Sequence, residues 1–372
     1  MRARQLGISI GRMEPGPDNS ITDVAGVRVG HTTLISGDGP LRPGRGPVRT
    51  GVTVVIPHDG DLWSEPVFAG AHRLNGNGEL TGLEWIREAG MLGGPIGITN
   101  THSVGVVRDA IIEAGARAHG MSDAIWALPV TGETYDGALN DINGFHVGAD
   151  HVHAALAAAS AGPVAEGNVG GGTGMICHEF KGGIGTASRR ADGWMVGVLV
   201  QANYGERELL RIDGVPVGAA IGLDEVPSPW DQLDAINARA TPAGGSIIGI
   251  VATDAPLLAH QCARLAQRVG MGVARMGSYA SHGSGDLFLA FATGNRDLSP
   301  GGGEDDRRRT VELRMVVDDH INPLLEAVAE ATEEAIVNAL LAAETMTGHD
   351  GITAHAISHD RLMDVMRAHG RG

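Results

Sequence analysis

The feature that most constrains this chain is an apolar strand that begins directly after Gly-Gly-Ser. In the segment Thr241–Thr253, two glycines precede Ser246, and the residues after the serine are small or β-branched. Because glycine has no Cβ, it permits the tight turn in which the Ser246 hydroxyl could attack the carbonyl of Gly245. A cut at this bond would leave Ser246 as a new amino-terminal residue.

A free Ser246 would carry two catalytic groups. Its α-amine would have a reference pKa of roughly 7.7–8.0. Near neutral pH the amine could therefore take the proton from the hydroxyl of the same residue. The same local pattern is also typical of an ordinary turn with a polar residue ahead of a strand. The choice between the two interpretations depends on the rest of the chain.

The composition indicates a close-packed core built from small side chains. Hydrophobic residues make up 42% of the 372 residues, but aromatic residues only 3%, and there are 57 glycines. A core of Ala, Val, Ile and Leu fills space only if backbones approach closely, which glycine allows. The length fits one large unit of helices and strands.

The charge and the cysteines exclude several classes of protein. A formal net charge of −16 argues against a nucleic-acid or anionic-membrane surface, since both need clustered basic residues. Cys177 and Cys262 form no disulfide framework and are expected to be buried in a reducing compartment. We find no signal peptide and no apolar run that could span a bilayer. We therefore expect a soluble cytoplasmic protein.

The hydrophobic pattern predicts a layered α+β fold. Short strands are expected over residues 21–33. Further strands are expected at 51–57, 194–202, 246–252 and 287–293, and helices at 104–119, 149–161, 254–269 and 323–347. The strand at 51–57 is apolar nearly throughout, which predicts burial on both faces. Strands and helices do not alternate strictly, so a layered arrangement is favoured over a dinucleotide-binding sheet.

Other motifs do not support metal, nucleotide or conventional hydrolase chemistry. The sixteen histidines include no His-Glu-x-x-His, and neither His178 nor His282 has a partner at ligand spacing. The glycine-rich run Gly167–Gly174 lacks the Gly-Lys-Ser/Thr ending of a phosphate loop. No serine lies in a Gly-x-Ser-x-Gly elbow.

Seven segments, in order along the chain, resemble those of one known family. They are Asn19–His31, Leu74–Gly82, Thr99–Gly105, Gly132–Gly137, Gly167–Gly174, Gly245–Ser246 and Ser281–Asp286. Together they resemble the DmpA-like aminopeptidases, which include an L-aminopeptidase that is also a D-alanine esterase/amidase, and the β-peptidyl aminopeptidases. Because the resemblance spans nearly the whole chain, it is far more specific than any one short motif.

The resemblance implies both a fold and a processing event. The fold is a four-layer αββα sandwich, shared with ornithine acetyltransferase-like proteins and related to the N-terminal-nucleophile hydrolases, from which it differs in strand order. The single catalytic domain, residues 1–372, would cleave itself into an α chain of residues 1–245 and a β chain of residues 246–372. Family members assemble as oligomers of such pairs, so we expect a homo-oligomer.

Four residues match the family's reaction centre. Ser246 matches the nucleophile and Asn203 the donor that stabilises the oxyanion, a role for which a neutral amide is suited. Ser284 and Asp286 match the pair that orients the nucleophile and its amine, although some relatives carry Glu in place of Asp286. Taken alone, Asn203 is also typical of a turn at a strand end, and Ser-Gly-Asp of an ordinary turn.

Two further residues match the pocket for the free amino group of the substrate. Glu133 would supply a buried carboxylate for the ammonium, and Tyr135 a directed hydrogen bond. A capped turn is the structural alternative for this segment. Glu79 and His102 lie in neighbouring motifs and are interpreted as scaffold around the site.

The predicted function is a self-cleaving serine aminopeptidase. It would remove N-terminal residues from short peptides, amino-acid amides or esters through an acyl-enzyme on Ser246, without a metal or organic cofactor. Three alternatives remain: acyl transfer of the ornithine acetyltransferase type, hydrolysis of 6-aminohexanoate oligomers, and a non-enzymatic binding protein on the same scaffold. Relatives with the first two activities typically use threonine. The preference for L-, D- or β-amino acids depends on pocket shape and stays open.

Overall fold

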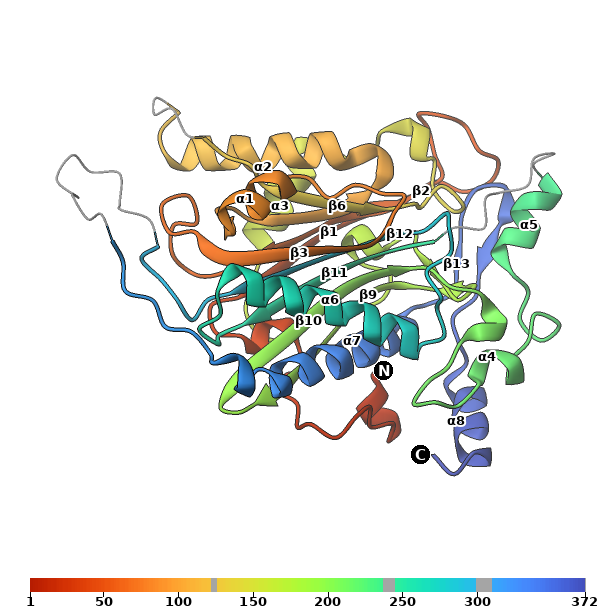
Figure 1. Cartoon of the computed structure of the whole chain (residues 1–372). Helices are drawn as coiled ribbons and strands as arrows, with labels where there is room; N and C mark the ends of the chain where they lie inside the picture. The colour runs from red at the N-terminus through yellow and green to blue at the C-terminus, as the bar shows by residue number, and fades with distance from the viewer. Residues whose placement is uncertain (122–125, 237–244, 299–309, 372) are drawn as a thin grey trace.

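The computed structural model describes residues 1–121, 126–236, 245–298 and 310–371, which form four layers (Figure 1). Helices α2 (Val104–Ala118) and α3 (Ala149–Ala158) cover a four-stranded sheet. This sheet packs on a six-stranded sheet, and α6 (Ala259–Arg275) and α7 (Asn322–Ala342) cover the other face of the second sheet. The predicted αββα sandwich is therefore confirmed.

The larger sheet has the strand order β4-β3-β12-β11-β10-β9, and the smaller has the order β1-β2-β5-β6. The strands are β1 (Arg28–Ser36), β2 (Val48–Ile56), β3 (Val67–Gly76), β4 (Met91–Leu92), β5 (Ile96–Asn100), β6 (Val130–Thr134), β9 (Gly183–Ala191), β10 (Trp194–Asn203), β11 (Ser246–Thr253) and β12 (Gly285–Ala292). Only the pairs β5–β6 and β11–β12 are parallel among the described strands of these sheets.

Smaller elements surround the sandwich. They are the hairpins β7 (Ile176–Cys177) with β8 (Phe180–Lys181) and β13 (Met346–Thr347) with β14 (Thr353–Ala354), and helices α1 (Leu83–Ala89), α4 (Val217–Ala220), α5 (Pro229–Ile236) and α8 (His359–Ala368). Helices α4, α5 and α8 gather at one side of the sandwich (Figure 1). None of the helices in the described part of the chain is long and apolar enough to cross a bilayer.

The central strand β11 lies between two apolar cores. Ile247 and Val251 face the core formed with α6 and α7, whereas Ile248 and Ile250 face the core between the sheets. Every residue of β11 is buried, as expected for a strand covered on both faces. The predicted burial of residues 51–57 is confirmed in the same way, because β2 is buried throughout.

Glycines let the helices approach the large sheet closely. A Cβ on Gly185 of β9 would overlap Ala335 of α7, and a Cβ on Gly70 of β3 would overlap Ala263 of α6. The facing helix residues are alanines in both places. Small residues thus replace aromatic side chains as the means of filling this core, as the composition predicts.

One predicted helix starts later than expected. The helix predicted over residues 254–269 is α6, which begins at Ala259. The preceding residues, Asp254–Leu258, are not helical. The Asp254 carboxylate accepts a hydrogen bond from the Met195 N–H at 2.7 Å, and Leu258 is extended. Asp254 therefore stabilises the start of β10 through this hydrogen bond and does not begin the helix.

A buried ionic network joins α7 to β9. The Arg189 guanidinium is fully buried and lies 3.1 Å from Glu330 and 2.6 Å from Glu334, which are both buried on α7. Arg4, near the amino terminus, also pairs with Glu334 at 3.0 Å. The buried charges therefore compensate one another, and removal of Arg189 would break the ion pair of Glu330 and one of the two pairs of Glu334.

We predict that Arg189→Met destabilises the fold strongly, because the buried Glu330 loses its ion pair and Glu334 keeps only the pair with Arg4. The free energy of unfolding should fall by roughly 3–5 kcal/mol. Urea denaturation of the Ser246→Ala chain, with and without the substitution, measures it. The matched control is Arg367→Met, because Arg367 forms an exposed pair with Asp364 that contributes less than about 1 kcal/mol. Equal losses in the two variants would contradict the prediction.

Candidate active site

The register of the large sheet brings three strand ends together at Ser246. This residue begins β11 and is paired with Asn203, the last residue of β10, and with Gly285, the first residue of β12. Ser246 is only 7% exposed. Thr241–Gly244, which precede this point in the predicted motif, lie outside the described residues.

The Gly285 N–H faces two oxygen atoms at the bond before Ser246. It lies 3.2 Å from the carbonyl oxygen of Gly245 and 3.3 Å from the Ser246 hydroxyl oxygen. A Cβ on Gly245 would overlap the backbone of Asn203 and Tyr204. Glycine is thus required at position 245, because no other residue lets the chain pass so close to the end of β10.

The Asn203 amide is fixed by two main-chain groups. Its Oδ1 accepts a hydrogen bond from the Ile176 N–H at 2.7 Å, and its Nδ2 donates to the carbonyl oxygen of Tyr135 at 3.0 Å. The side chain is 1% exposed. Nδ2 carries two hydrogens, and the described residues accept one of them. The amide is therefore preorganised to donate the other beside Ser246.

Ser284 and Asp286 form a buried hydrogen-bonded pair next to Ser246. The Ser284 hydroxyl donates to Asp286 Oδ1 at 2.5 Å, and Asp286 is 1% exposed. Burial raises the pKa of Asp286 to about 6, against the opposing hydrogen bond from Ser284. The carboxylate can therefore change its protonation state at mildly acidic pH.

Glu133 reaches the same region from β6 of the small sheet. Its carboxylate accepts hydrogen bonds from the Glu79 N–H at 3.0 Å and from the Thr101 hydroxyl. Burial raises the pKa of Glu133, since desolvation disfavours the charged form. An ammonium group bound here would restore the missing charge partner.

Tyr135 lies just after β6 and is 38% exposed, so its ring is accessible to a ligand. Burial, followed by the neighbouring Asp136 carboxylate, raises the pKa of Tyr135, which keeps the phenol protonated. Asp136 is fully buried and accepts hydrogen bonds from the amides of Asn100 and Asn140 at 3.1 Å. These bonds anchor the chain on one side of Tyr135.

The structure thus brings all of the sequence-predicted residues to one end of the sandwich. Ser246, Asn203, Ser284 and Asp286 come from the ends of adjacent strands of the large sheet, and Glu133 and Tyr135 from the small sheet. Residues 1–245 and 246–372 both contribute, so a cut would leave a site shared by two chains.

Sequence reasoning missed two supporting residues. Thr101 holds Glu133, and Lys181 supports the loop that fixes Asn203. The Lys181 ammonium is fully buried and donates to the carbonyl oxygens of Met175 and Gly182 at 2.7 and 2.8 Å. Burial lowers the pKa of Lys181 to about 7. The sequence feature that could have indicated a special role for Lys181 is that it is the only lysine among the 28 basic residues.

Both cysteines are buried, as predicted, and burial raises the pKa of the Cys177 thiol to about 12, so it is not a nucleophile near neutral pH. Among the described residues, no group of three or more His, Cys, Asp or Glu side chains is arranged to hold a metal ion.

Solved structures share this fold over the whole chain. A β-aminopeptidase from Burkholderia sp. superposes with a TM-score of 0.90 and 54% identity, covering 100% of both chains. The L-aminopeptidase D-Ala-esterase/amidase from Ochrobactrum anthropi superposes with a TM-score of 0.88 and 43% identity, covering 100% of this chain and 99% of its own. The latter is described as a prototype for the serine aminopeptidases and a variant of the Ntn hydrolase fold.

The fold and these relatives define an aminopeptidase of the N-terminal-nucleophile class. Residues 19–354 match peptidase family S58, and the chain belongs to this family. A relative named β-peptidyl aminopeptidase BapA, from Sphingosinicella microcystinivorans, is 48% identical, with 100% of this chain and 93% of the relative covered. Its namesake from Sphingosinicella xenopeptidilytica is 45% identical, with coverages of 99% and 91%. The predicted family and enzyme class are confirmed.

The fixed amide of Asn203 leads to a prediction about catalysis. We expect Asn203→Ala to lower kcat roughly 10²–10³-fold with little change in KM, because a donor to the oxyanion acts mainly in the transition state. Steady-state kinetics with an amino-acid p-nitroanilide, expressed per free Ser246 amino terminus, measures it. The control is Asn295→Ala, which lies beyond the far end of β12. An unchanged kcat in Asn203→Ala would contradict the assignment.

Proposed function

We propose that the chain cleaves itself between Gly245 and Ser246 and that the freed Ser246 then serves as nucleophile and base. The observation that carries this proposal is the Gly285 N–H, which faces the Gly245 carbonyl oxygen and the Ser246 hydroxyl at 3.2 and 3.3 Å. A donor in this position stabilises negative charge as it develops on the carbonyl oxygen.

Self-cleavage would proceed through an ester. Ser246 Oγ attacks the carbonyl carbon of Gly245 and loses its proton, and the bond from this carbon to the Ser246 nitrogen breaks as the nitrogen gains a proton. Water then hydrolyses the ester to release the carboxyl group of Gly245 and restore the hydroxyl. The buried Ser284–Asp286 pair supports the first step, since an ionised Asp286 fixes the Ser284 hydroxyl beside the nucleophile.

Peptide hydrolysis would then use the same atoms with the new amine. The Ser246 amine takes the hydroxyl proton as Oγ attacks the substrate carbonyl, and Asn203 Nδ2 donates to the oxyanion. The amine returns the proton to the leaving nitrogen, and water hydrolyses the acyl-enzyme. Glu133 would bind the substrate ammonium, with Tyr135 beside it, which restricts the enzyme to free N-termini.

We further propose that the accepted N-terminal residues include β-amino acids. The support is the 54% identity to a β-aminopeptidase and the 48% and 45% identities to β-peptidyl aminopeptidases over nearly the whole chain. Substrates would be short peptides, amino-acid amides or esters. Assembly as a homo-oligomer of processed pairs and a cytoplasmic location stay predictions of the same account.

The first prediction of this proposal concerns the cut itself. Purified wild-type protein should consist of two fragments, one with the amino terminus Ser-Ile-Ile-Gly. Ser246→Ala should stay a single inactive chain of 38.4 kDa. Intact-mass spectrometry measures both. Ser64→Ala, which removes a hydroxyl from the loop ahead of β3, is the matched control and should be processed. Two fragments from Ser246→Ala would refute the assignment.

The second prediction concerns the pH dependence of self-cleavage. Because the pKa of Asp286 is raised to about 6, its carboxylate is ionised above that pH and protonated below it. The first-order cleavage rate should therefore fall about tenfold per pH unit below about pH 6. Asp286→Asn should be slow, without this pH dependence.

Asp136 provides the matched control for this titration. Burial also raises the pKa of Asp136 to about 6, but its carboxylate accepts hydrogen bonds from Asn100 and Asn140, away from the nucleophile. Asp136→Asn should keep the pH profile of the wild type. If Asp136→Asn loses the pH dependence of the cleavage rate and Asp286→Asn keeps it, the titrating group is Asp136. This result would contradict the mechanism.

A further inference from the structure

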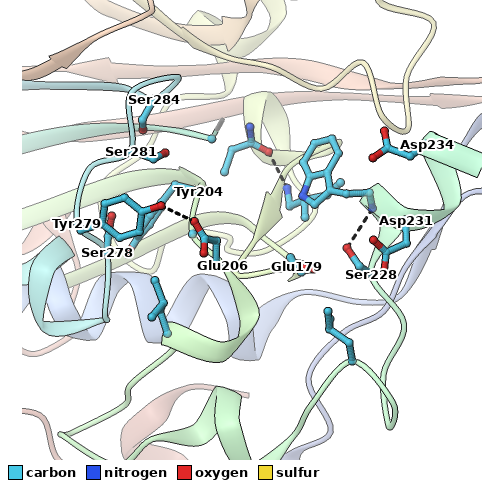
Figure 2. A pocket seen from close by; sticks show the side chains of 17 residues that line it. Glu179, Tyr204, Glu206, Ser228, Asp231, Asp234, Ser278, Tyr279, Ser281 and Ser284 are labelled. Carbon is cyan, nitrogen blue, oxygen red and sulfur yellow. Dashed lines mark hydrogen bonds between the residues drawn. The ribbon is translucent and has the colours of Figure 1, made fainter. Parts of the chain in front are cut away.

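A cavity of about 290 Å³ adjoins the nucleophile and shares part of its wall with the reaction centre (Figure 2). Asn203, Gly245 and Ser284 line it on one side. The remaining wall comes from the turn between β7 and β8, from residues 204–209, from α5 with the residues before it, and from residues 278–281. A ligand in this cavity would therefore touch the reacting atoms.

The cavity and the Glu133 carboxylate lie on different sides of Ser246. In the strand order β3-β12-β11-β10, Glu133 contacts Gly78 and Glu79, which follow β3. Asn203 and Tyr204, at the end of β10, line the cavity, whereas Glu133 does not. Tyr135 is not part of the wall either, although its carbonyl oxygen accepts a hydrogen bond from Asn203. A substrate with its ammonium at Glu133 and its carbonyl at Ser246 would therefore extend its leaving group into the cavity.

Every charged side chain in the described cavity wall is acidic. The four carboxylates are Glu179, Glu206, Asp231 and Asp234. Figure 2 shows Asp231 and Asp234 on one side of the cavity, Tyr279 on the other and Glu206 between them. A cavity with this lining attracts cations and repels anions, and its partly enclosed walls strengthen both effects relative to open solvent.

Two of these carboxylates are held in place by hydrogen bonds. The Tyr279 hydroxyl donates to Glu206 at 2.7 Å, and the Arg207 N–H donates to Glu179 at 3.0 Å. The Arg207 guanidinium is itself buried on main-chain carbonyl oxygens and on the ring of Phe180, so it does not line the cavity. It offsets part of the charge of Glu179. Glu206 and Asp231 add negative charge to the wall beside it.

Apolar side chains complete the cavity wall. Leu209, Leu223 and the indole of Trp230 lie among the carboxylates. A lysine or arginine side chain combines an aliphatic stem with a terminal cation, so its stem can pack on leucine while its head meets carboxylates. The face of a tryptophan also attracts such a cation. An uncharged small group would form no ion pair with the carboxylates of the wall.

We propose that this cavity is a leaving-group subsite that selects a cationic residue, lysine or arginine, directly after the scissile bond. The inference rests on the proposed function, because it places the substrate by the ammonium at Glu133 and the attack by Ser246. It adds a specificity that the reaction centre alone does not supply.

Three matched substrates test the proposal: β-alanyl-lysinamide, β-alanyl-norleucinamide and β-alanyl-glutamic acid α-amide. The amides remove the terminal carboxylate, so the charge of the side chain is the variable. We expect kcat/KM for the lysine substrate to exceed that for norleucine roughly tenfold, as two or three partly exposed ion pairs would produce. The glutamate substrate should be the poorest. Raising NaCl from 50 to 500 mM should reduce the preference, since salt screens exposed charges.

Variants then locate the preference. Glu206→Gln and Asp231→Asn should each raise KM for the lysine substrate and leave the norleucine kinetics unchanged. Glu208→Gln is the matched control: it makes the same chemical change on an exposed neighbour outside the cavity wall, and it should keep the wild-type preference. Lysinamide should inhibit the wild type more strongly than norleucinamide, which reports binding without turnover.

The outcomes separate this inference from the function on which it rests. Equal rates for the three substrates, or a preference for glutamate, would overturn the cationic subsite and leave the aminopeptidase intact. A lysine preference that persists in both carboxylate variants would place the selectivity elsewhere and also overturn it. Failure to hydrolyse any of these amides, by a protein that has not cleaved itself, would overturn the proposed function together with the subsite.

Discussion

The parallel pairing of β11 with β12, beside the end of β10, is the constraint on which the rest of the site depends. It sets Ser246 opposite Gly285 and Asn203, and it puts the Gly285 N–H against the Gly245 carbonyl oxygen. The strands are buried on both faces, so this register cannot slip without moving their side chains from one core to the other. The apolar cores thus fix the position of Ser246 and of the strand ends around it.

Burial also sets the charge state of the site. Asp286 and Glu133 lie in places where desolvation raises the pKa of a carboxyl group, and each is stabilised by hydrogen bonds from neighbours. A nearby cation stabilises the charged form of such a carboxyl group. In the proposed mechanism, these cations would be the Ser246 amine and the substrate ammonium. In the proposed subsite, the carboxylates of the cavity would likewise attract a cationic leaving group. In the proposed mechanism, carboxylates would thus recognise amines at successive points of the reaction.

The local sequence pattern predicts the central strands of the large sheet, whereas other parts of the fold and the site depend on contacts between distant residues. The apolar strands β10, β11 and β12 were predictable because each carries its burial signal in its own residues. Strand β9 was not, since its buried Ser188 and Arg189 are satisfied by Asp23 and by two glutamates of α7, far away in the sequence. Likewise, family motifs identified Glu133 and Asn203, but Thr101, Lys181 and the acidic cavity depend on contacts that only the folded chain creates.

The central claim is that one folded molecule breaks its own chain before Ser246. The most direct measurement follows the 38.4 kDa chain by intact-mass spectrometry after uncut protein is refolded from urea at several dilutions. The account predicts a first-order cut at the Gly245–Ser246 bond with a rate constant that does not change with protein concentration. A rate that rises with concentration, a cut at another bond, or folded protein that keeps its full mass would contradict it.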